Sequence, residues 1–333
     1  MMKAIQFKAG RQLGDSDLAG WVDIERPVAT GHDILVKVEA VGMNPVDGKR
    51  RPLEGDDDRI LGFDAAGTVI ECGDLVAGHS VGDEVYYSGN VLRQGCNAEF
   101  QLVDSRIVAK RPSSLNIAEA AAVPLTGITA WEALFDRLGI DLDGGNRGHS
   151  LLIIGGAGGM GSMGIQLAKL AGLSVIATAS RDESAAWCRK LGADHVIDHR
   201  EPLLPQLEAL GMESVDFIAN FNNTSAYWDQ MSDVIAPQGK IVLIVDPEGA
   251  LNLGGNYKTK SVTIVWEFMA TRPVFETHDI ARQADILQRL ATLIDAGSVQ
   301  SPVGEHLGVI SPENLITAHR RIASGSTIGK LVL

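Results

Sequence analysis

The sequence is poor in cysteine and contains no C-x-x-C pair. Its three cysteines, Cys72, Cys96 and Cys188, are far apart and odd in number. A disulfide framework needs paired cysteines, and the usual structural zinc cluster needs closely spaced ones. The sequence therefore predicts three free thiols and no zinc cluster of that kind.

Long apolar runs, blocks of Lys or Arg, repeats and low-complexity segments are also absent. No apolar stretch is long enough to span a bilayer, and residues 1–7 look like the start of a strand, not like a signal peptide. The 29 Lys and Arg residues are outnumbered by 42 Asp and Glu residues, which gives a formal charge of −13. Such a chain is a poor partner for nucleic acid or an anionic membrane. From these absences we predict a cytoplasmic protein that binds neither.

Glycine, in contrast, is abundant, and one group of glycines is informative. Residues 151–154 form a continuous apolar run typical of a central parallel strand. Directly after it, Gly156, Gly158 and Gly161 fall on the G-x-G-x-x-G spacing, and residues 163–171 follow as a predicted helix. We expect the first glycine to allow a tight turn, the second to let backbone approach a pyrophosphate, and the third to let helix and strand pack together.

A second predicted strand, residues 174–179, lies at the distance that a dinucleotide-binding strand–helix–strand unit requires. The positive N-terminal end of the intervening helix would face the phosphates. We therefore predict a dinucleotide site, with an ordinary strand–helix turn as the alternative. The residues of this turn expected to bind the cofactor are Gly156, Ala157, Gly158, Gly159, Met160 and Gly161.

The chain is long enough for two domains, since 333 residues exceed the size at which a single core stops growing. Its first third consists of short predicted strands. The middle alternates strand and helix, which predicts an α/β protein with a doubly wound parallel sheet. The six strands expected there are 151–154, 174–179, 196–198, 215–219, 240–245 after a turn at 237–239, and 261–268. A last strand, residues 328–333, is expected to pair within the N-terminal β block. The predicted domains are therefore 1–125 with 271–333, and 126–270 inserted between them.

Six segments, in order, are similar to the medium-chain dehydrogenase/reductase superfamily, and specifically to its zinc-free quinone oxidoreductase-like branch. They are Val41–Asp47, Gly62–Gly67, Gly82–Val85, Pro124–Trp131, Gly156–Ser162 and Leu191–Ile197. The resemblance covers essentially the full chain and includes a subgroup often labelled zinc-binding alcohol dehydrogenases. It implies a six-stranded Rossmann sheet, a GroES-like β-rich catalytic domain, and a homodimer in which the sixth strands pair across a two-fold axis.

The residues argue against zinc within this resemblance. Zinc-dependent members place Cys where this chain has Asn44, His where it has Phe63, and a second Cys near Leu125. Catalytic zinc needs three converging N, S or O ligands, and these residues do not supply them. We predict no metal, and a zinc-dependent alcohol dehydrogenase is the alternative.

The end of the second predicted strand favours NADP(H) over NAD(H). NAD-specific folds place Asp or Glu there, whereas this chain has Ser180 and Arg181. A hydroxyl and a guanidinium suit a 2′-phosphate. The resemblance adds His199 to this phosphate site. The alternative is that Asp182 supplies the acidic group, although it also suits a helix N-cap.

The resemblance places Asn44 and Thr129 beside the nicotinamide as catalytic residues. Asn44 would hydrogen-bond an acceptor oxygen and stabilise enolate or quinol charge. The alternatives are a turn residue ahead of Pro45 for Asn44 and a helix N-cap for Thr129. Further cofactor contacts are expected from Val245, the last residue of the fifth predicted strand, whose following loop should line the site. Phe268 and Met269, at the end of the sixth strand, are expected to flank the nicotinamide, with core packing as the alternative for these two.

Without a metal to polarise a carbonyl, the favoured acceptors are those already prone to hydride addition. The predicted function is therefore an NADPH-dependent reductase of quinones or α,β-unsaturated carbonyls. Many relatives have a tyrosine shortly after the N-P-x-D segment, but residues 48–53 contain none, so solvent would deliver the proton. The alternatives are a zinc-dependent alcohol dehydrogenase and an NADPH-binding redox sensor with little turnover.

Overall fold

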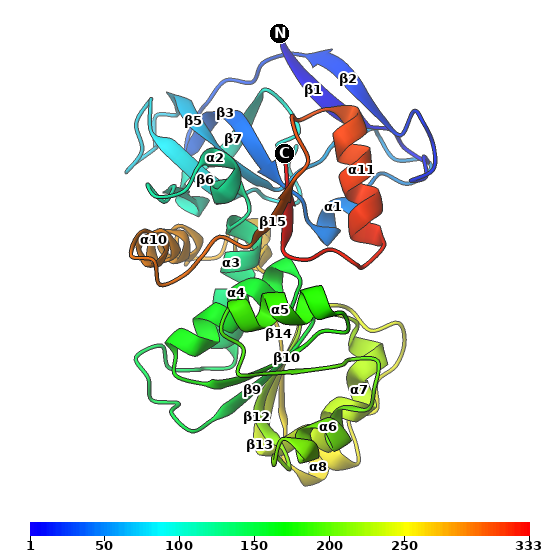
Figure 1. The fold of residues 1–333 in the computed structure, drawn as a ribbon. Helices are drawn as coiled ribbons and strands as arrows, with labels where there is room; N and C mark the ends of the chain where they lie inside the picture. Colours follow the sequence, from blue (N-terminus) through cyan, green and yellow to red (C-terminus); the bar gives the residue numbers. More distant parts are fainter. The chain divides into compact units, whose positions relative to one another are not determined.

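The computed structural model describes residues Met1–Leu333, which form two compact units (Figure 1). The β-rich unit consists of Met1–Ile128 and Ala270–Leu333. The α/β unit consists of Thr129–Met269. The β-rich unit is therefore built from both ends of the chain, and the α/β unit is inserted between them.

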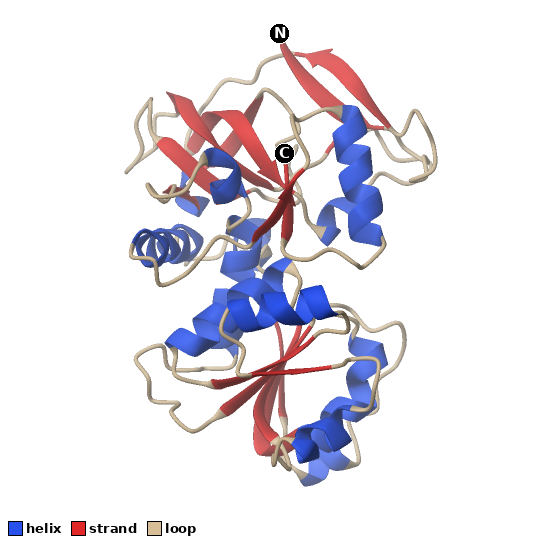
Figure 2. Cartoon of the chain, in the orientation of Figure 1, coloured by secondary structure: helices blue, strands red, loops and turns tan.

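The α/β unit contains the predicted six-stranded parallel sheet, in the order β11-β10-β9-β12-β13-β14. Its helices cover both faces, with α4 and α5 on one side and α6 and α7 on the other (Figures 1 and 2). This arrangement confirms the doubly wound fold predicted from the sequence. The elements are β9 (Ser150–Ile154), α4 (Gly159–Leu170), β10 (Ser174–Thr178), α5 (Asp182–Lys190), β11 (His195–Ile197), α6 (Leu203–Ala209), β12 (Val215–Asn220), α7 (Thr224–Val234), β13 (Ile235–Leu243), α8 (Asn256–Thr259) and β14 (Thr263–Trp266).

Two strand predictions in this unit need correction. The predicted turn at 237–239 lies inside β13, where Gln238 has a φ of 62° and the pairing with β12 shifts register. The turn residues therefore form an irregularity within a longer strand, which tolerates the positive φ. The sixth strand, β14, spans only Thr263–Trp266 and is shorter at both ends than the predicted 261–268; Ser261, with a φ of 53°, lies outside it.

The β-rich unit holds a larger sheet in the order β15-β16-β3-β5-β6-β8, with β7 also paired to β3, and a small sheet β2-β1-β4. Its strands are β1 (Met2–Phe7), β2 (Ala19–Ile24), β3 (Asp33–Gly42), β4 (Arg59–Ile60), β5 (Asp64–Cys72), β6 (Glu84–Ser88), β7 (Phe100–Asp104), β8 (Val108–Lys110), β15 (Val303–His306) and β16 (Lys330–Val332). Its helices are α1 (Pro45–Lys49), α2 (Ile117–Ala121), α9 (Thr271–Phe275), α10 (Arg282–Asp295) and α11 (Pro312–Ala323), with a 3₁₀ turn at Ser105–Ile107. The boundary between the units falls within α3 (Pro124–Trp131), which continues as a π-helical turn, Glu132–Arg137.

The C-terminal strand closes the β-rich unit as the sequence predicts. β16 is antiparallel to β3, and the backbone N–H groups of Val41 and Met43 donate to the carbonyls of Leu333 and Leu331, each at 2.9 Å. Residues from both ends of the chain, including Ile5, share one apolar core. The last residues are thereby fixed beside the end of β3, where α1 begins.

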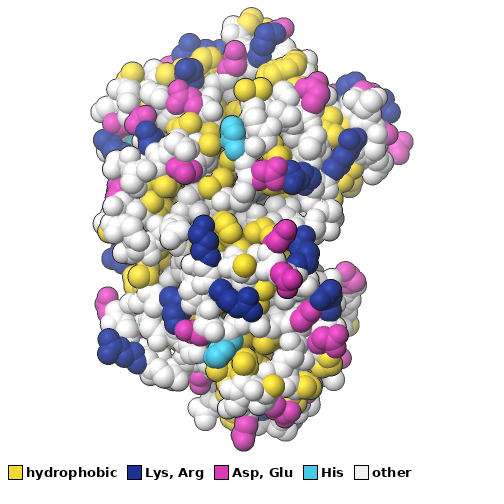
Figure 3. All heavy atoms as spheres, in the orientation of Figure 1, with side chains coloured by type: hydrophobic (Ala, Val, Ile, Leu, Met, Phe, Trp, Pro, Cys, Tyr) yellow, Lys and Arg dark blue, Asp and Glu magenta, His cyan; other side chains and the backbone are white.

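No helix has both the length and the apolar character needed to cross a membrane. On the face shown in Figure 3, Lys and Arg side chains are interspersed with Asp and Glu side chains.

Candidate functional site

The glycine turn after β9 has the geometry of a tight strand-to-helix connection. Gly155, with a φ of 88°, adopts the left-handed conformation, and Gly156 follows it within the same turn. Packing also requires a glycine at position 156. A Cβ at this position would lie 2.7 Å from the Cβ of Ala177 on β10. The Thr178 hydroxyl accepts a hydrogen bond from the Gly155 N–H at 3.0 Å and ties the turn to the neighbouring strand.

The other two motif glycines differ in their surroundings. A Cβ on Gly161 would collide with the carbonyl oxygens of Gly155 and Gly156, so α4 packs directly on the turn. A Cβ on Gly158 would meet only the Gly155 oxygen, at 3.6 Å. Gly158 is the N-cap of α4 and provides no capping side chain. The N–H groups of the first turn have no acceptor within a helix, so this open end suits an anionic group.

The carboxyl ends of β10 and β11 bring the predicted phosphate ligands to one edge of the sheet. Thr178 pairs with Ile197, and the Ala179 N–H donates to the Ile197 carbonyl at 2.9 Å. The segments that leave these strands carry partly buried Ser180, exposed Arg181, partly buried His199 and exposed Arg200.

The titratable side chains at this edge differ in their environments. Burial lowers the pKa of His199, which favours its neutral form. Arg200, which the sequence analysis did not single out, forms a two-pronged ion pair with Asp198 at 2.6 and 3.0 Å. Arg181 is the N-cap of α5 and Asp182 is its first residue, so the expectation that Asp182 is the N-cap is wrong. The Asp182 carboxylate still lies at the positive end of the helix, which explains an acidic residue there.

The remaining predicted cofactor residues lie beyond β13 and β14. Val245 follows β13, and its carbonyl accepts a hydrogen bond from the Thr224 hydroxyl. Phe268 is 45% exposed, whereas Met269 is buried. Core packing therefore does not account for Phe268.

In the β-rich unit, Asn44 belongs to a buried polar cluster formed by Asn44, Asp47, Asp64 and Lys330. We call it the Asn44 cluster. Asn44 is the N-cap of α1, and the Asp47 carboxylate accepts its backbone N–H at 2.6 Å. The Asn44 side chain turns to other partners. Its Oδ1 accepts from Lys330 Nζ at 2.5 Å, and its Nδ2 donates to Asp64 Oδ2 at 2.8 Å.

Lys330 is fully occupied inside this cluster. Its ammonium donates to the Met43 carbonyl at 2.7 Å and to Asp64 Oδ2 at 2.9 Å, besides Asn44 Oδ1. Asp64 is equally engaged, since its Oδ1 accepts the backbone N–H of Leu125 at 2.7 Å. Burial raises the pKa of Asp47 to about 7, although the Asn44 N–H and the Lys330 charge oppose this shift. No local sequence pattern points to Lys330, because it lies 286 residues from Asn44.

Thr129 is buried in the middle of α3, which begins at Pro124. The expectation that Thr129 is a helix N-cap is therefore wrong. Tyr86 and Tyr87 are fully buried on β6, where their hydroxyls donate to the Leu287 carbonyl and to Gln101 Oε1. Burial raises both tyrosine pKa values, and both hydroxyls already have protein partners.

Two family models match parts of the chain. A family model described as alcohol dehydrogenase GroES-like domain matches residues 30–113, and one described as zinc-binding dehydrogenase matches residues 191–333. A zinc-type alcohol dehydrogenase-like protein of Staphylococcus aureus (strain MSSA476) is 42% identical over 100% of this chain and 99% of its own length. This chain belongs to the medium-chain dehydrogenase/reductase superfamily.

Within this superfamily the chain is an oxidoreductase related to proteins with several named activities. The 2-methylene-furan-3-one reductase of Solanum lycopersicum is 30% identical over 90% of this chain and 71% of that protein. A crystal structure from Rhizobium etli CFN 42, assigned to the zinc-dependent alcohol dehydrogenases, has a TM-score of 0.94 at 43% identity and covers 100% and 97% of the two chains. The quinone oxidoreductase of Coxiella burnetii has a TM-score of 0.80 at 28% identity, with 99% and 98% covered.

Several of these names refer to zinc, but the residues of this dehydrogenase/reductase do not fit a zinc ion. No three His, Cys, Asp or Glu side chains converge in a way that could hold a metal. Phe63 is an apolar core residue. Asp64 and Asn44 already bind the Lys330 ammonium, so their oxygens are not open to a metal.

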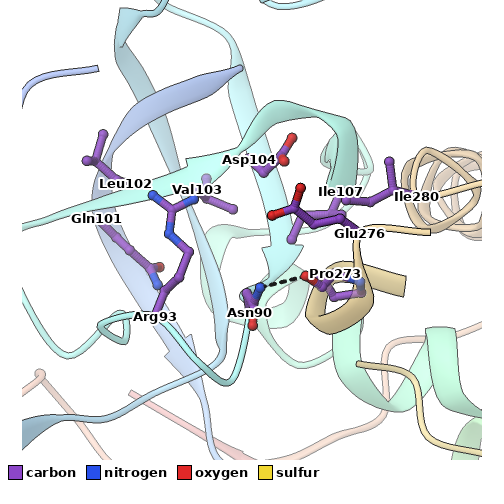
Figure 4. Close-up of a pocket in the computed structure, with 10 residues that line it drawn as sticks. All are labelled: Asn90, Arg93, Gln101, Leu102, Val103, Asp104, Ile107, Pro273, Glu276 and Ile280. Atoms are coloured by element: carbon purple, nitrogen blue, oxygen red, sulfur yellow. Dashed lines mark hydrogen bonds between the residues drawn. The ribbon is translucent and has the colours of Figure 1, made fainter. Parts of the chain in front are cut away.

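One cavity lies in the β-rich unit between β7 and the segment after α9 (Figure 4). It has room for about 60 Å³ of solvent, far less than the roughly 300–1,000 Å³ of a typical small-molecule site. Arg93 at its wall is paired with Asp33, Asp104 is paired with Arg106, and Asn90 donates to the Pro273 carbonyl at 2.8 Å. We therefore do not place the active site in this cavity.

Proposed function

We propose that this chain is an NADPH-dependent reductase that transfers hydride to a quinone or an α,β-unsaturated carbonyl without a metal ion. The observation that carries the proposal is the open N-terminus of α4 at Gly158, with Arg181 at the end of the adjacent strand. Backbone N–H groups suit a pyrophosphate, and a guanidinium suits the additional 2′-phosphate of NADPH. The named activities of the Solanum lycopersicum and Coxiella burnetii relatives support this acceptor class.

In this proposal the dinucleotide binds the turn Gly156–Gly161, with Ser180, Arg181 and His199 at the 2′-phosphate. Val245, Phe268 and Met269 line the nicotinamide, and Thr129 lies beside it. NADPH supplies the hydride, which adds to the electron-poor carbon of the acceptor, and solvent supplies the proton that completes the reduction.

Asn44 has the acceptor-binding role in this scheme. One N–H of its amide is held firmly by Asp64, whereas the other has only a long contact of 3.4 Å with the Gly42 carbonyl. This weakly held N–H is the donor that we assign to the acceptor oxygen, where negative charge develops during hydride transfer. The neighbouring Lys330 charge replaces the metal that other members use at this place.

The direct test measures NADPH and NADH oxidation by purified protein with a panel of quinones, enones and simple ketones, together with the metal content. We expect turnover with quinones or enones, preference for NADPH and no stoichiometric zinc. About one zinc per chain with alcohol oxidation would establish the zinc-dependent alternative. Tight NADPH binding without turnover would establish the redox sensor.

The coenzyme preference has a separate test in Arg181→Ala. Loss of a charged hydrogen bond of about 1.5–3 kcal/mol should raise the KM for NADPH at least about tenfold and leave that for NADH unchanged. Arg200→Ala is the matched control at the same edge. Its guanidinium is already bound by Asp198, so we expect a smaller effect. Equal loss with both coenzymes in Arg181→Ala would contradict the 2′-phosphate assignment.

A further inference from the structure

We infer that Lys330 and Asp64 are positioning residues that lock the amide of Asn44 in its working orientation. The inference rests on the proposed role of Asn44 as the donor to the acceptor oxygen. It concerns a residue 286 positions away in the sequence, on the last strand of the chain.

The orientation of the Asn44 amide is fixed by charge on both sides. Lys330 offers only donors, so the atom that faces it at 2.5 Å must be the amide oxygen. The Asp64 carboxylate offers only acceptors, so the atom that faces it at 2.8 Å must be the amide nitrogen. A flipped amide would place N–H against the ammonium and oxygen against the carboxylate. Both contacts would be repulsive at 1% exposure, where water screens little.

The same contacts strengthen the donor. A cation on the amide oxygen draws electron density from the nitrogen, which makes the remaining N–H more polar. Asp64 binds one hydrogen of the Asn44 amide. Only the second hydrogen, which has the 3.4 Å contact with the Gly42 carbonyl, is left for the oxygen of the substrate. Lys330 and Asp64 thus determine which amide hydrogen of Asn44 faces the substrate and how polar that N–H bond is.

The backbone around Lys330 fixes the place of the ammonium. The Lys330 N–H donates to the Pro302 carbonyl at 2.8 Å, and strand pairing joins Leu331 and Leu333 to the end of β3. Gly329 turns the chain into β16 with a φ of 63°, at a point where a Cβ would lie 3.0 Å from the backbone nitrogen of Gly304. The backbone of Lys330 is therefore held within the sheet, where β16 lies between β15 and β3.

The test compares the wild type with Lys330→Met and with Lys330→Met/Asp64→Asn. The double variant is included because Lys330→Met leaves a buried unpaired carboxylate, which by itself destabilises the fold. In each folded variant we expect kcat to fall at least about tenfold, with the Kd for NADPH and the KM for the acceptor within about twofold of wild type. Arg93→Met is the control, because it removes a two-pronged ion pair with Asp33 in the same unit without touching Asn44. We expect its kcat to stay unchanged.

A second readout needs no turnover. With ¹⁵N-labelled asparagine, the side-chain amide of Asn44, identified by its loss in Asn44→Ala, should exchange slowly in the wild type and in Arg93→Met. It should exchange at least about tenfold faster in the Lys330 variants. Unchanged exchange, or an unchanged kcat in a folded Lys330 variant, would overturn the inference. If the wild type turns over no acceptor, the proposed function fails, and the amide exchange alone decides whether the lock exists.

Discussion

At the scale of single residues, two buried titratable side chains of the β-rich unit oppose each other in their effect on stability. Burial raises the pKa of Asp47 to about 7, and burial together with the Arg51 charge lowers the pKa of His319 to about 4. Asp47 holds its proton in the folded state at pH values where the unfolded chain has lost it. His319 stays neutral in the folded state where the unfolded chain is protonated.

The signs follow from proton counting. For Asp47, stability falls as the pH rises from about 3.8 to about 7, because the unfolded state binds fewer protons. For His319, stability rises as the pH rises from about 4 to about 6.5, because the unfolded state binds more. At 1.36 kcal/mol per pKa unit, the two effects are about 4 and about 3 kcal/mol, so they largely cancel in the wild type.

Single substitutions should therefore reveal a pH dependence that the wild type hides. Relative to wild type, Asp47→Asn should gain stability by about 3 kcal/mol between pH 5 and 7, and His319→Phe should lose stability as the pH rises from 4 to 6.5. Urea unfolding at a series of pH values measures both slopes. Asp57→Asn, at an exposed position, is the control. If Asp47→Asn and Asp57→Asn gave parallel profiles, the buried acid would not be the cause.

At the scale of elements, two glycines of the turn between β9 and α4 have different roles: one is needed for packing, and the other leaves space for a ligand. A methyl group at Gly161 would collide with the carbonyl oxygens of Gly155 and Gly156 in the turn. Gly158 has open space at the N-terminus of α4. Gly161 is therefore needed for helix packing, and Gly158 for ligand space. The motif spacing predicts both roles, and the surrounding contacts assign them.

Two alanine substitutions in this turn should have opposite outcomes. Gly161→Ala should destabilise the protein by roughly 1–3 kcal/mol, because helix and turn must move apart. Gly158→Ala should change the unfolding free energy by less than about 0.5 kcal/mol but raise the Kd for NADPH at least about tenfold, since the methyl group occupies the space for the pyrophosphate. Thermal unfolding and NADPH fluorescence titration measure the two effects. Unchanged NADPH binding in Gly158→Ala would argue against a dinucleotide at this turn.

At the scale of the whole molecule, the free edge of the α/β sheet bears on assembly. β14 is an edge strand, and Trp266 at its end is 49% exposed. An unpaired edge with exposed apolar residues is a place where a second copy can add its own strand. We propose that two chains pair through β14.

A lysine at this edge should weaken the proposed dimer. Trp266→Lys should raise the dissociation constant of the dimer at least about tenfold, because pairing would bury a charge. Trp21→Lys, at a tryptophan of similar exposure on β2, should leave assembly unchanged. Sedimentation velocity at micromolar concentration measures both. A monomeric wild type, or equal loss of dimer in the two variants, would contradict pairing through β14.

The sequence by itself determined the features that depend on local preferences. Short apolar runs that alternate with helical segments predicted the six parallel strands, and the glycine spacing predicted the strand–helix turn. Strand, helix and turn preferences depend on neighbouring residues, so a sequence pattern can predict them. Only the tertiary structure decided that Gly155 has the positive φ in this turn, that the 237–239 segment lies inside β13, and that Lys330 binds Asn44 and Asp64. These outcomes depend on contacts between residues distant in the sequence, and no local pattern encodes such contacts.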